Sequence, residues 1–455
     1  MILAQIDLTT GSIPKTLLRF AFPMICGNLL QQLYNVADTL IVGRFLGSDA
    51  LGAVGSSYTL MTFLTSILLG LCMGSGALFS VCWGQRDLAK LRRQTHAAFV
   101  LIAVCTVVLN AAAFLLLDAM KTLLSVPAEV WPLMRSYLFV IFFGIGGTFL
   151  YNYYASLLRA VGNSLVPLLF LAASAVLNIA LDLVFVLVCR WGVEGAAAAT
   201  VLAQWLSGIG TAVYTLVRCP ELRARREERR ITGAMLRELL SASVLTCLQQ
   251  SVMNLGILMV QGRINSFGPV IMAAFAAAVK IDSFAYMPLQ DFGNAFSTFI
   301  AQNYGAQQPE RARKGVRTGI LLSLGCMGVC AVGVILLARP LLSIISPSEA
   351  VISFGARFLY IITPFYLVIS FNQMYAGALR GIGESVVPTV IMLFSFVVFR
   401  QIYLYLATTM IADEQLRFVI VALAYPVGWM LCSALEAIAY HRSRLFHPAL
   451  KKAEA

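Results

Sequence analysis

Charge is scarce in this chain of 455 residues, where Asp, Glu, Lys and Arg together make up 12% of the sequence. Soluble domains carry about 25% charged residues, and the hydrophobic share here is 60%. The polar stretches are also short, since the longest, residues 218–235, is too short to fold alone. These shortages exclude a soluble globular protein and indicate an all-α integral membrane protein.

Several motifs of known chemistry are missing as well. No G-x-x-x-x-G-K-[ST] phosphate loop occurs, so this chain does not use ATP, and neither H-E-x-x-H nor G-x-S-x-G is present. The three histidines lie at predicted helix ends or in the tail, and the ten cysteines form no C-x-x-C pair. We therefore predict no enzyme, no cofactor and no histidine or cysteine metal site. The N-terminus has no signal-peptide pattern, so we expect none.

Long apolar stretches fill the rest of the chain. Each has about 20 to 30 residues, enough for a helix to cross about 30 Å of hydrocarbon. We predict twelve transmembrane helices, at residues 14–43, 51–82, 94–118, 131–157, 164–189, 193–217, 236–262, 268–300, 316–338, 352–378, 386–410 and 416–440.

Positive charge is distributed unevenly along this predicted topology. Most of the 33 Lys and Arg residues fall in the N-terminus, the even-numbered loops and the C-terminal tail. The positive-inside rule therefore places both termini in the cytoplasm of a multi-pass plasma-membrane protein. The basic cluster at residues 223–230 is expected to solvate a loop and contact anionic lipid, not nucleic acid. We expect a monomer in the bilayer.

The chain contains an internal duplication. The segment ASLLRAVGNSLVP at 155–167 resembles AGALRGIGESVVP at 376–388, and residues 83–93 resemble 304–314 at the same offset of 221 residues. Two distant matches at one offset indicate a repeat. We predict an N-lobe at 1–225 and a C-lobe at 226–455, each with six spans, and a substrate route between them.

The repeated segments also suggest gates. Arg159 and Arg380 lie on the predicted cytoplasmic side, each shortly before a Gly-x-x-x-x-Pro turn. A turn with a topology-setting arginine explains this pattern, and so does a cytoplasmic gate. Pro23 lies inside the first span, where proline permits a kink, so we regard it as a candidate hinge.

Polar residues converge at one depth of the predicted N-lobe. At 1.5 Å per residue, Asp38 lies about 9 Å below the outer end of the first span, and Asp182 about 12 Å below that of the fifth. Thr200 lies at a similar depth on the sixth span, and Asn178 is one turn deeper than Asp182 on the same helix face. Lipid-facing helices do not carry such residues.

Two nearby carboxylates repel each other, and one proton or one Na⁺ relieves the repulsion. We therefore predict a cation-coupling site at Asp38, Asn178, Asp182 and Thr200, with no metal beyond a possible Na⁺. A structural hydrogen-bond network is the alternative. At the repeat offset, Asn178 and Asp182 become Phe399 and Tyr403, so the acidic pair is confined to one half.

The stretches YNVADTLIVGRFLG at 34–47, LNIALD at 177–182, GAAAAT at 195–200 and AQNYGA at 301–306 resemble the multidrug and toxic compound extrusion (MATE) family along the whole chain. The resemblance implies two pseudo-symmetric six-helix bundles around a central cleft. It also implies export of cationic amphipathic compounds in exchange for Na⁺ or H⁺. Family members with an N-lobe site use residues that match Asp38, Asn178, Asp182 and Thr200. Another branch has acidic residues within helices seven and ten, where this chain has the amides Gln249, Gln250, Asn254, Asn372 and Gln373.

The C-lobe carries charges elsewhere, with Lys280, Asp282 and Asp291 on the eighth span and Arg400 on the eleventh. Asp282 can form a structural pair with Lys280 or Arg400, or bind a cationic substrate; Asp291 has the second option too. The candidate substrate-cleft residues are Gln31, Asn35, Tyr151, Gln250, Asn254, Asp282, Met287, Asp291 and Asn372.

The sequence thus favours a secondary active antiporter that exports amphipathic, cationic drugs or metabolites in exchange for H⁺ or Na⁺ by alternating access. The alternative is a flippase for a lipid-linked precursor, which would need more arginines in its cleft to hold pyrophosphate. The sequence does not choose between the two coupling ions.

Overall fold

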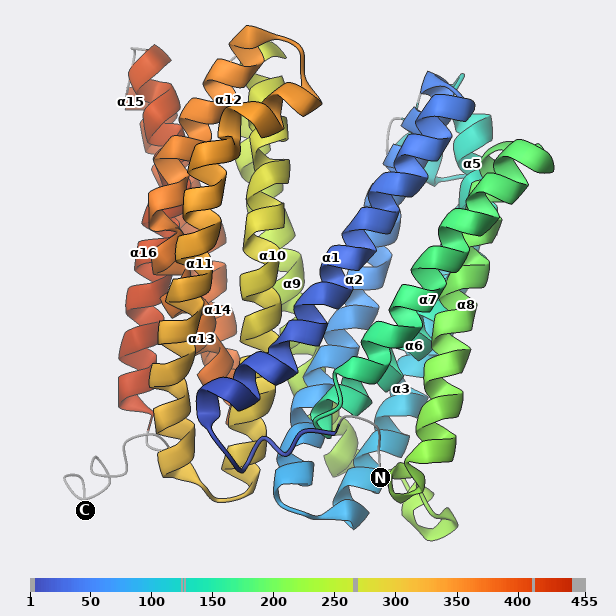
Figure 1. Cartoon of the computed structure of the whole chain (residues 1–455), viewed down its shortest axis with the longest axis vertical. Helices are drawn as coiled ribbons and strands as arrows, with labels where there is room; N and C mark the ends of the chain where they lie inside the picture. The colour runs from blue at the N-terminus through green and yellow to red at the C-terminus, as the bar shows by residue number, and fades with distance from the viewer. Residues whose placement is uncertain (1–4, 124–125, 127, 265–268, 411–413, 444–455) are drawn as a thin grey trace. The chain divides into compact units, whose positions relative to one another are not determined.

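The computed structural model describes residues 5–123, 126, 128–264, 269–410 and 414–443, and within this part every regular element is a helix (Figure 1). Each of the twelve predicted spans falls on one helical run. Ten of the runs in the described residues are long and apolar enough to cross a membrane. The predicted all-α membrane fold is therefore confirmed.

The first half of the chain begins with three long helices and continues with three further spans, two of which change their helical winding. Its elements are α1 (Ile13–Phe45), α2 (Ser48–Gly84), α3 (Leu88–Leu115), α4 (Met120–Leu123), α5 (Trp131–Ile141), η1 (Phe142–Gly144), α6 (Ile145–Ala160), α7 (Leu165–Asp182), the π-helix η2 (Leu183–Val188) and α8 (Gly192–Arg218), followed by the short turns η3 (Pro220–Leu222) and η4 (Arg226–Arg229).

The second half has the same order of long helices and also contains one π-helix. Its elements are α9 (Gly233–Ile264), α10 (Pro269–Gly305), α11 (Pro309–Ile345), α12 (Glu349–Ile362), η6 (Thr363–Phe365), α13 (Tyr366–Gly381), α14 (Val386–Leu393), the π-helix η7 (Phe394–Phe399), α15 (Arg400–Met410) and α16 (Glu414–Arg442).

The backbone repeats the turns predicted from the duplication. Gly162 and Gly383, 221 residues apart, both have φ of 89°, and Arg86 and Gln307 at the same offset have φ of 60° and 57°. At Gly162 a Cβ atom would lie 2.1 Å from the Ile6 carbonyl oxygen, so only glycine fits this turn. The repeat is thus present in local geometry as well as in sequence.

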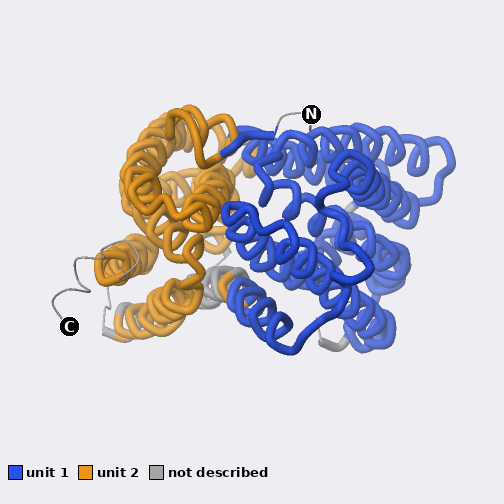
Figure 2. The backbone as a smooth tube through the Cα atoms, turned by 90° about the horizontal axis from the view of Figure 1, so that it is seen from below, with its two compact units in different colours: residues 1–7, 22–247 blue, residues 8–21, 248–455 orange. Residues whose placement is uncertain are grey.

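The described chain forms two compact units that exchange segments (Figure 2). Unit 1 comprises residues 1–7 and 22–247, and unit 2 comprises residues 8–21 and 248–455. The divisions fall inside α1, next to Pro23, and inside α9, so both helices contribute to both units. The lobes predicted at 1–225 and 226–455 stay a prediction, because a repeat boundary and a packing boundary need not coincide.

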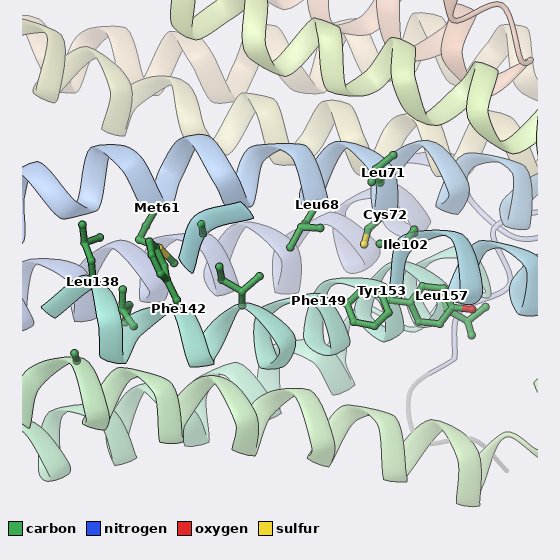
Figure 3. Packing of buried hydrophobic residues seen from close by; sticks show 14 of the residues in the cluster. Met61, Leu68, Leu71, Cys72, Ile102, Leu138, Phe142, Phe149, Tyr153 and Leu157 are labelled. Atoms are coloured by element: carbon green, nitrogen blue, oxygen red, sulfur yellow. The ribbon is translucent and has the colours of Figure 1, made fainter. Parts of the chain in front are cut away.

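Aliphatic and aromatic side chains fill the core of unit 1, among them Leu68 and Cys72 of α2, Ile102 of α3 and Phe149 and Tyr153 of α6 (Figure 3). Tyr153 lies among Phe79, Phe99 and Phe149, with ring centroids 5.2 to 6.4 Å apart. Its hydroxyl donates to the Thr95 carbonyl oxygen at 2.6 Å, which satisfies the polar end of a buried ring. Helix α6 packs in turn against α8.

An ion pair anchors the basic loop between the two halves. Arg92 at the start of α3 contacts Glu228 through two nitrogens, with N···O distances of 2.8 Å. Both side chains are nearly buried, and Glu228 also accepts from the Arg225 backbone N–H at 2.9 Å. The hydrogen bonds from Arg92 lower the pKa of Glu228, so the pair persists well into the acidic range.

We expect Glu228→Gln to release this loop, because a neutral amide cannot hold Arg92 in a two-point ion pair. Limited trypsin digestion of the purified protein should then cleave at residues 225–230 several-fold faster. The matched control is Glu227→Gln, which removes the same charge from the exposed neighbouring residue. Equal cleavage of both variants would contradict an anchoring role.

Candidate ion-binding site

Three helices of unit 1 bring the four predicted ion-site residues together. Asp38 lies on α1, Asn178 and Asp182 on the last turns of α7, and Thr200 on α8. The Asp38 and Asp182 carboxyl groups are within hydrogen-bonding reach of each other. The Asn178 amide donates to the Thr200 hydroxyl at 3.3 Å, and that hydroxyl donates to the Ala196 carbonyl oxygen at 3.1 Å. The depth estimate from the sequence thus corresponds to a real cluster.

The cluster is largely buried and contains several oxygen atoms that accept no hydrogen bond from the described residues. Asp182 is 0% exposed and Asn178 is 1% exposed, whereas Asp38 is half-buried. Among the described residues no donor reaches Asp38 Oδ1, Asn178 Oδ1 or either carboxylate oxygen of Asp182. Buried acceptors without donors are expensive. A proton shared by the carboxyl groups, or a hard cation bound to these oxygens, satisfies them.

The helix that carries Asp182 changes its winding immediately after this residue. The π-helix η2 spans Leu183–Val188, and the Cys189 N–H donates to the Val184 carbonyl oxygen at 2.9 Å, five residues back. Such segments are rare and often lie at functional sites. The unit 2 π-helix begins at Phe394, although the repeat offset would place its counterpart at residue 404. The two π-helices thus lie in corresponding spans of the repeat but ten residues apart in its register.

Two tyrosines that the sequence did not assign to the site lie beside the carboxyl pair. Tyr137 on α5 is 6% exposed and interacts electrostatically with both Asp38 and Asp182. Tyr34 lies one turn before Asp38 on α1, forms a hydrogen bond with Gln31, and is close to Tyr151. The i, i+4 spacing from Tyr34 to Asp38 was a usable signal, whereas no sequence spacing links Tyr137 to the pair.

The predicted cleft residues of unit 1 divide into two groups. Gln31 and Tyr151 join the surroundings of Asp38 through Tyr34. Asn35 instead forms hydrogen bonds within its own helix. Its side-chain amide donates to the Gln32 side-chain oxygen at 3.0 Å, and its backbone carbonyl oxygen accepts from the Thr39 hydroxyl at 2.8 Å. On α1, Gln31 thus belongs to the surroundings of Asp38, whereas Asn35 forms hydrogen bonds within the helix.

In unit 2, Asp282 is bound to a tyrosine. The Tyr366 hydroxyl donates to Asp282 Oδ1 at 2.6 Å, and Arg400 supplies a nearby positive charge. Arg400 lies over the rings of Phe396 and Tyr425, at 5.0 and 4.9 Å from their centroids. Lys280 is exposed two residues before Asp282 on α10. Of the two partners considered for Asp282, Arg400 is thus the one that the structure brings near.

The remaining predicted residues lie in varied settings. Asp291 is buried on α10, and Met287 is half-buried one turn earlier. Asn372 is buried and donates to Cys432 Sγ at 2.8 Å. Arg159 and Arg380 occupy the last turns of α6 and α13, directly before the left-handed glycines. The side chains of Gln250 and Asn254 lie outside the described residues.

Comparison with known proteins shows what the chain is similar to. A family model described as MatE matches residues 23–184 and 242–406. "Probable multidrug resistance protein YpnP" of Bacillus subtilis (strain 168) is 29% identical over 395 residues, covering 87% of this chain and 88% of the relative. "Probable multidrug resistance protein YoeA" of the same organism is 27% identical over 391 residues, covering 84% of each chain.

A solved structure supports the fold. The outward-facing conformation of a multidrug resistance MATE family transporter of the MOP superfamily superimposes with a TM-score of 0.88 at 21% identity. The match covers 99% of this chain and 100% of the other.

The carboxyl pair predicts an unusual pH dependence of stability. Asp182→Asn replaces one of two repelling acceptors by an amide that can donate to Asp38. We expect the thermal midpoint of the wild type to fall as the pH rises through neutrality, by several degrees, and that of the variant to change less. Asp118→Asn, which alters an exposed carboxylate paired with Arg135, is the control. Parallel pH profiles of wild type and Asp182→Asn would contradict direct repulsion.

Proposed function

This chain belongs to the MatE family of transporters, and on that premise we propose that it is a secondary active antiporter. It exports amphipathic, cationic drugs or metabolites in exchange for H⁺ or Na⁺ by alternating access. The names of its relatives support drug export, since YpnP and YoeA are both described as probable multidrug resistance proteins. We further propose that it acts as a monomer. We also propose that both termini lie in the cytoplasm, as the distribution of Lys and Arg predicts.

The observation that carries this proposal is the contact between the Asp38 and Asp182 carboxyl groups. Two acceptors in contact at low exposure need a positive charge between them. When no positive charge lies between its two carboxylates, a site of this kind binds a single proton or Na⁺ strongly. It releases that ion when a competing cation takes its place or when a conformational change separates the carboxylates.

The coupling then follows from the position of the pair. Asp38 and Asp182 lie on different helices, so the ion joins α1 to α7 and its loss lets their repulsion separate them. The ion and the substrate must prefer different states of the protein for exchange to occur. Entry of the ion from outside favours the state that expels the substrate, and release of the ion inside restores the state that binds it.

The surroundings of Asp38 suit an organic cation. Tyr34 interacts with this carboxyl group and with Tyr58 and Tyr151, and aromatic faces attract cations and stack with flat rings. A substrate held there would compete electrostatically with the coupling ion. In unit 2, Asp282 already accepts from Tyr366 beside Arg400. We therefore favour a structural role for Asp282 and assign cation recognition to the tyrosines near Asp38.

Helix α1 supplies the movable element of the proposal. Pro23 is half-buried inside this helix, next to the point where its residues pass from unit 2 to unit 1. Proline removes one backbone hydrogen bond and weakens the helix there. We propose that neutralisation of Asp38 or Asp182 changes the bend at Pro23, and that Arg159 and Arg380 belong to the cytoplasmic gate.

Dye efflux from liposomes tests the function. With the purified protein inserted and a pH or Na⁺ gradient imposed separately, efflux of an ethidium-type dye should follow one gradient. Asp38→Asn and Asp182→Asn should each lower the gradient-driven rate at least about tenfold, in line with typical coupling energies.

The exposed variant Asp118→Asn serves as the control and should retain the wild-type rate. Normal gradient-driven efflux in both pair variants would refute the assigned coupling site. Dye efflux that responds to neither gradient would refute ion-coupled export.

A further inference from the structure

A third deeply buried carboxyl group lies in unit 2, on a helix that the sequence did not connect with ion binding. Glu436 is 0% exposed on α16, although it is only six residues from the end of this helix at Arg442. Six residues correspond to about 9 Å along the helix axis. No nitrogen or oxygen donor among the described residues reaches either carboxylate oxygen.

The immediate neighbours of Glu436 are weak or neutral donors. The Cys432 thiol lies beside it, one turn earlier on α16, and thiols donate poorly. Cys432 in turn accepts from the Asn372 amide at 2.8 Å and lies near the buried Ser395 hydroxyl of η7. None of these three neighbours, Cys432, Asn372 and Ser395, carries a positive charge.

One cation faces this carboxyl group. Arg380, at the end of α13, interacts electrostatically with Glu436 and with Tyr286 of α10, but it makes no direct ion pair with Glu436. Arg400 of α15 is directed to Asp282, Tyr425 and Cys432.

Within the part of the chain that the structure describes, the other helices packed against α16 add no charge near Glu436. Helix α14 has no titratable side chain. On α12, which forms the opposite half of the span that ends at Arg380, Arg357 is exposed and Glu349 pairs with Arg339.

The duplication shows that the fold does not require an acid at this position. At the offset of 221 residues, Cys432 and Glu436 correspond to Thr211 and Thr215 of α8. Both threonines are buried and donate to backbone carbonyls of their own helix, at 2.6 and 2.7 Å. At this place unit 1 thus has hydroxyl groups that form hydrogen bonds within their own helix. Unit 2 instead has a carboxyl group that no nitrogen or oxygen donor among the described residues reaches.

From this arrangement we propose that Glu436 is a second proton-binding group of the protein, located in unit 2, with Arg380 as its counter-charge. In the packing seen here, Glu436 takes a proton from water at the helix end and is a neutral acid. Loss of that proton leaves a carboxylate that draws Arg380 into an ion pair and so tightens α13 against α16. The group acts separately from the Asp38–Asp182 pair, which lies in unit 1.

Infrared spectroscopy of the purified full-length protein tests this proposal. In the Asp38→Asn, Asp182→Asn background, the carboxyl pair of unit 1 no longer contributes to the carboxylic C=O stretch. Adding Glu436→Gln should remove the intensity of one protonated carboxyl group per protein at neutral pH. The matched control is Glu384→Gln, which changes a less buried acid four residues after Arg380 and should leave the carboxylic band unchanged.

A carboxylic band that Glu436→Gln leaves unchanged from acidic to alkaline pH would overturn the proposal, because Glu436 would then be permanently ionised. Should Glu436→Gln fail to fold, Arg380→Gln replaces it: without its counter-charge Glu436 must keep its proton to higher pH, and an unshifted titration of the band would also overturn the proposal. The readout needs no transport, so a failure of gradient-driven efflux at Asp38 and Asp182 would not affect it.

Discussion

The repulsion between the Asp38 and Asp182 carboxyl groups is the interaction on which the rest of this account depends. Both are acceptors, Asp182 is fully buried, and no donor among the described residues reaches its oxygens. Water screens such a contact poorly, so its free energy changes steeply when one positive charge is bound or lost. This pair is the centre of the proposed ion site. Around it lie helices α1, α7 and α8, the π-turn after Asp182 and the tyrosines near Asp38.

The two halves of the chain share their turns but differ in their buried charges. Gly162 and Gly383 adopt the same left-handed conformation, yet the acidic pair of unit 1 corresponds to Phe399 and Tyr403 in unit 2. Conversely, Glu436 of unit 2 corresponds to Thr215 of unit 1. A duplicated scaffold therefore carries different polar groups in each copy, which is what a directional cycle needs, since two identical sites would respond to an ion in the same way.

The elements of this fold could be predicted from the sequence because membrane spans and duplications leave patterns that extend over many residues. The spans follow from apolar length, the repeated turns from Gly and Pro spacing, and the ion site from depth along α1, α7 and α8. Counting residues along a straight helix was enough to bring Asp38, Asp182 and Thr200 to one level. The same counting did not reveal that Asn35 bonds along its own helix.

Other features could not be derived in this way. The π-helix after Asp182 depends on local packing, and its unit 2 equivalent is out of register with the repeat. Tyr137 reaches the carboxyl pair from a helix with no matching spacing, and Glu436 was inconspicuous because acids near helix ends are usually solvated. Its burial comes from the packing of α13 and η7 against α16.

The central claim is that one coupling ion binds between Asp38 and Asp182 and competes with substrate. The most direct test is to add a cationic dye to purified protein in weakly buffered solution and to count the ions released, by pH change and by a Na⁺-selective electrode. We expect release of about one H⁺ or one Na⁺ per bound dye in the wild type and none in the double variant Asp38→Asn, Asp182→Asn. Dye binding that releases no ion in the wild type, or the same ion count in the double variant, would contradict it.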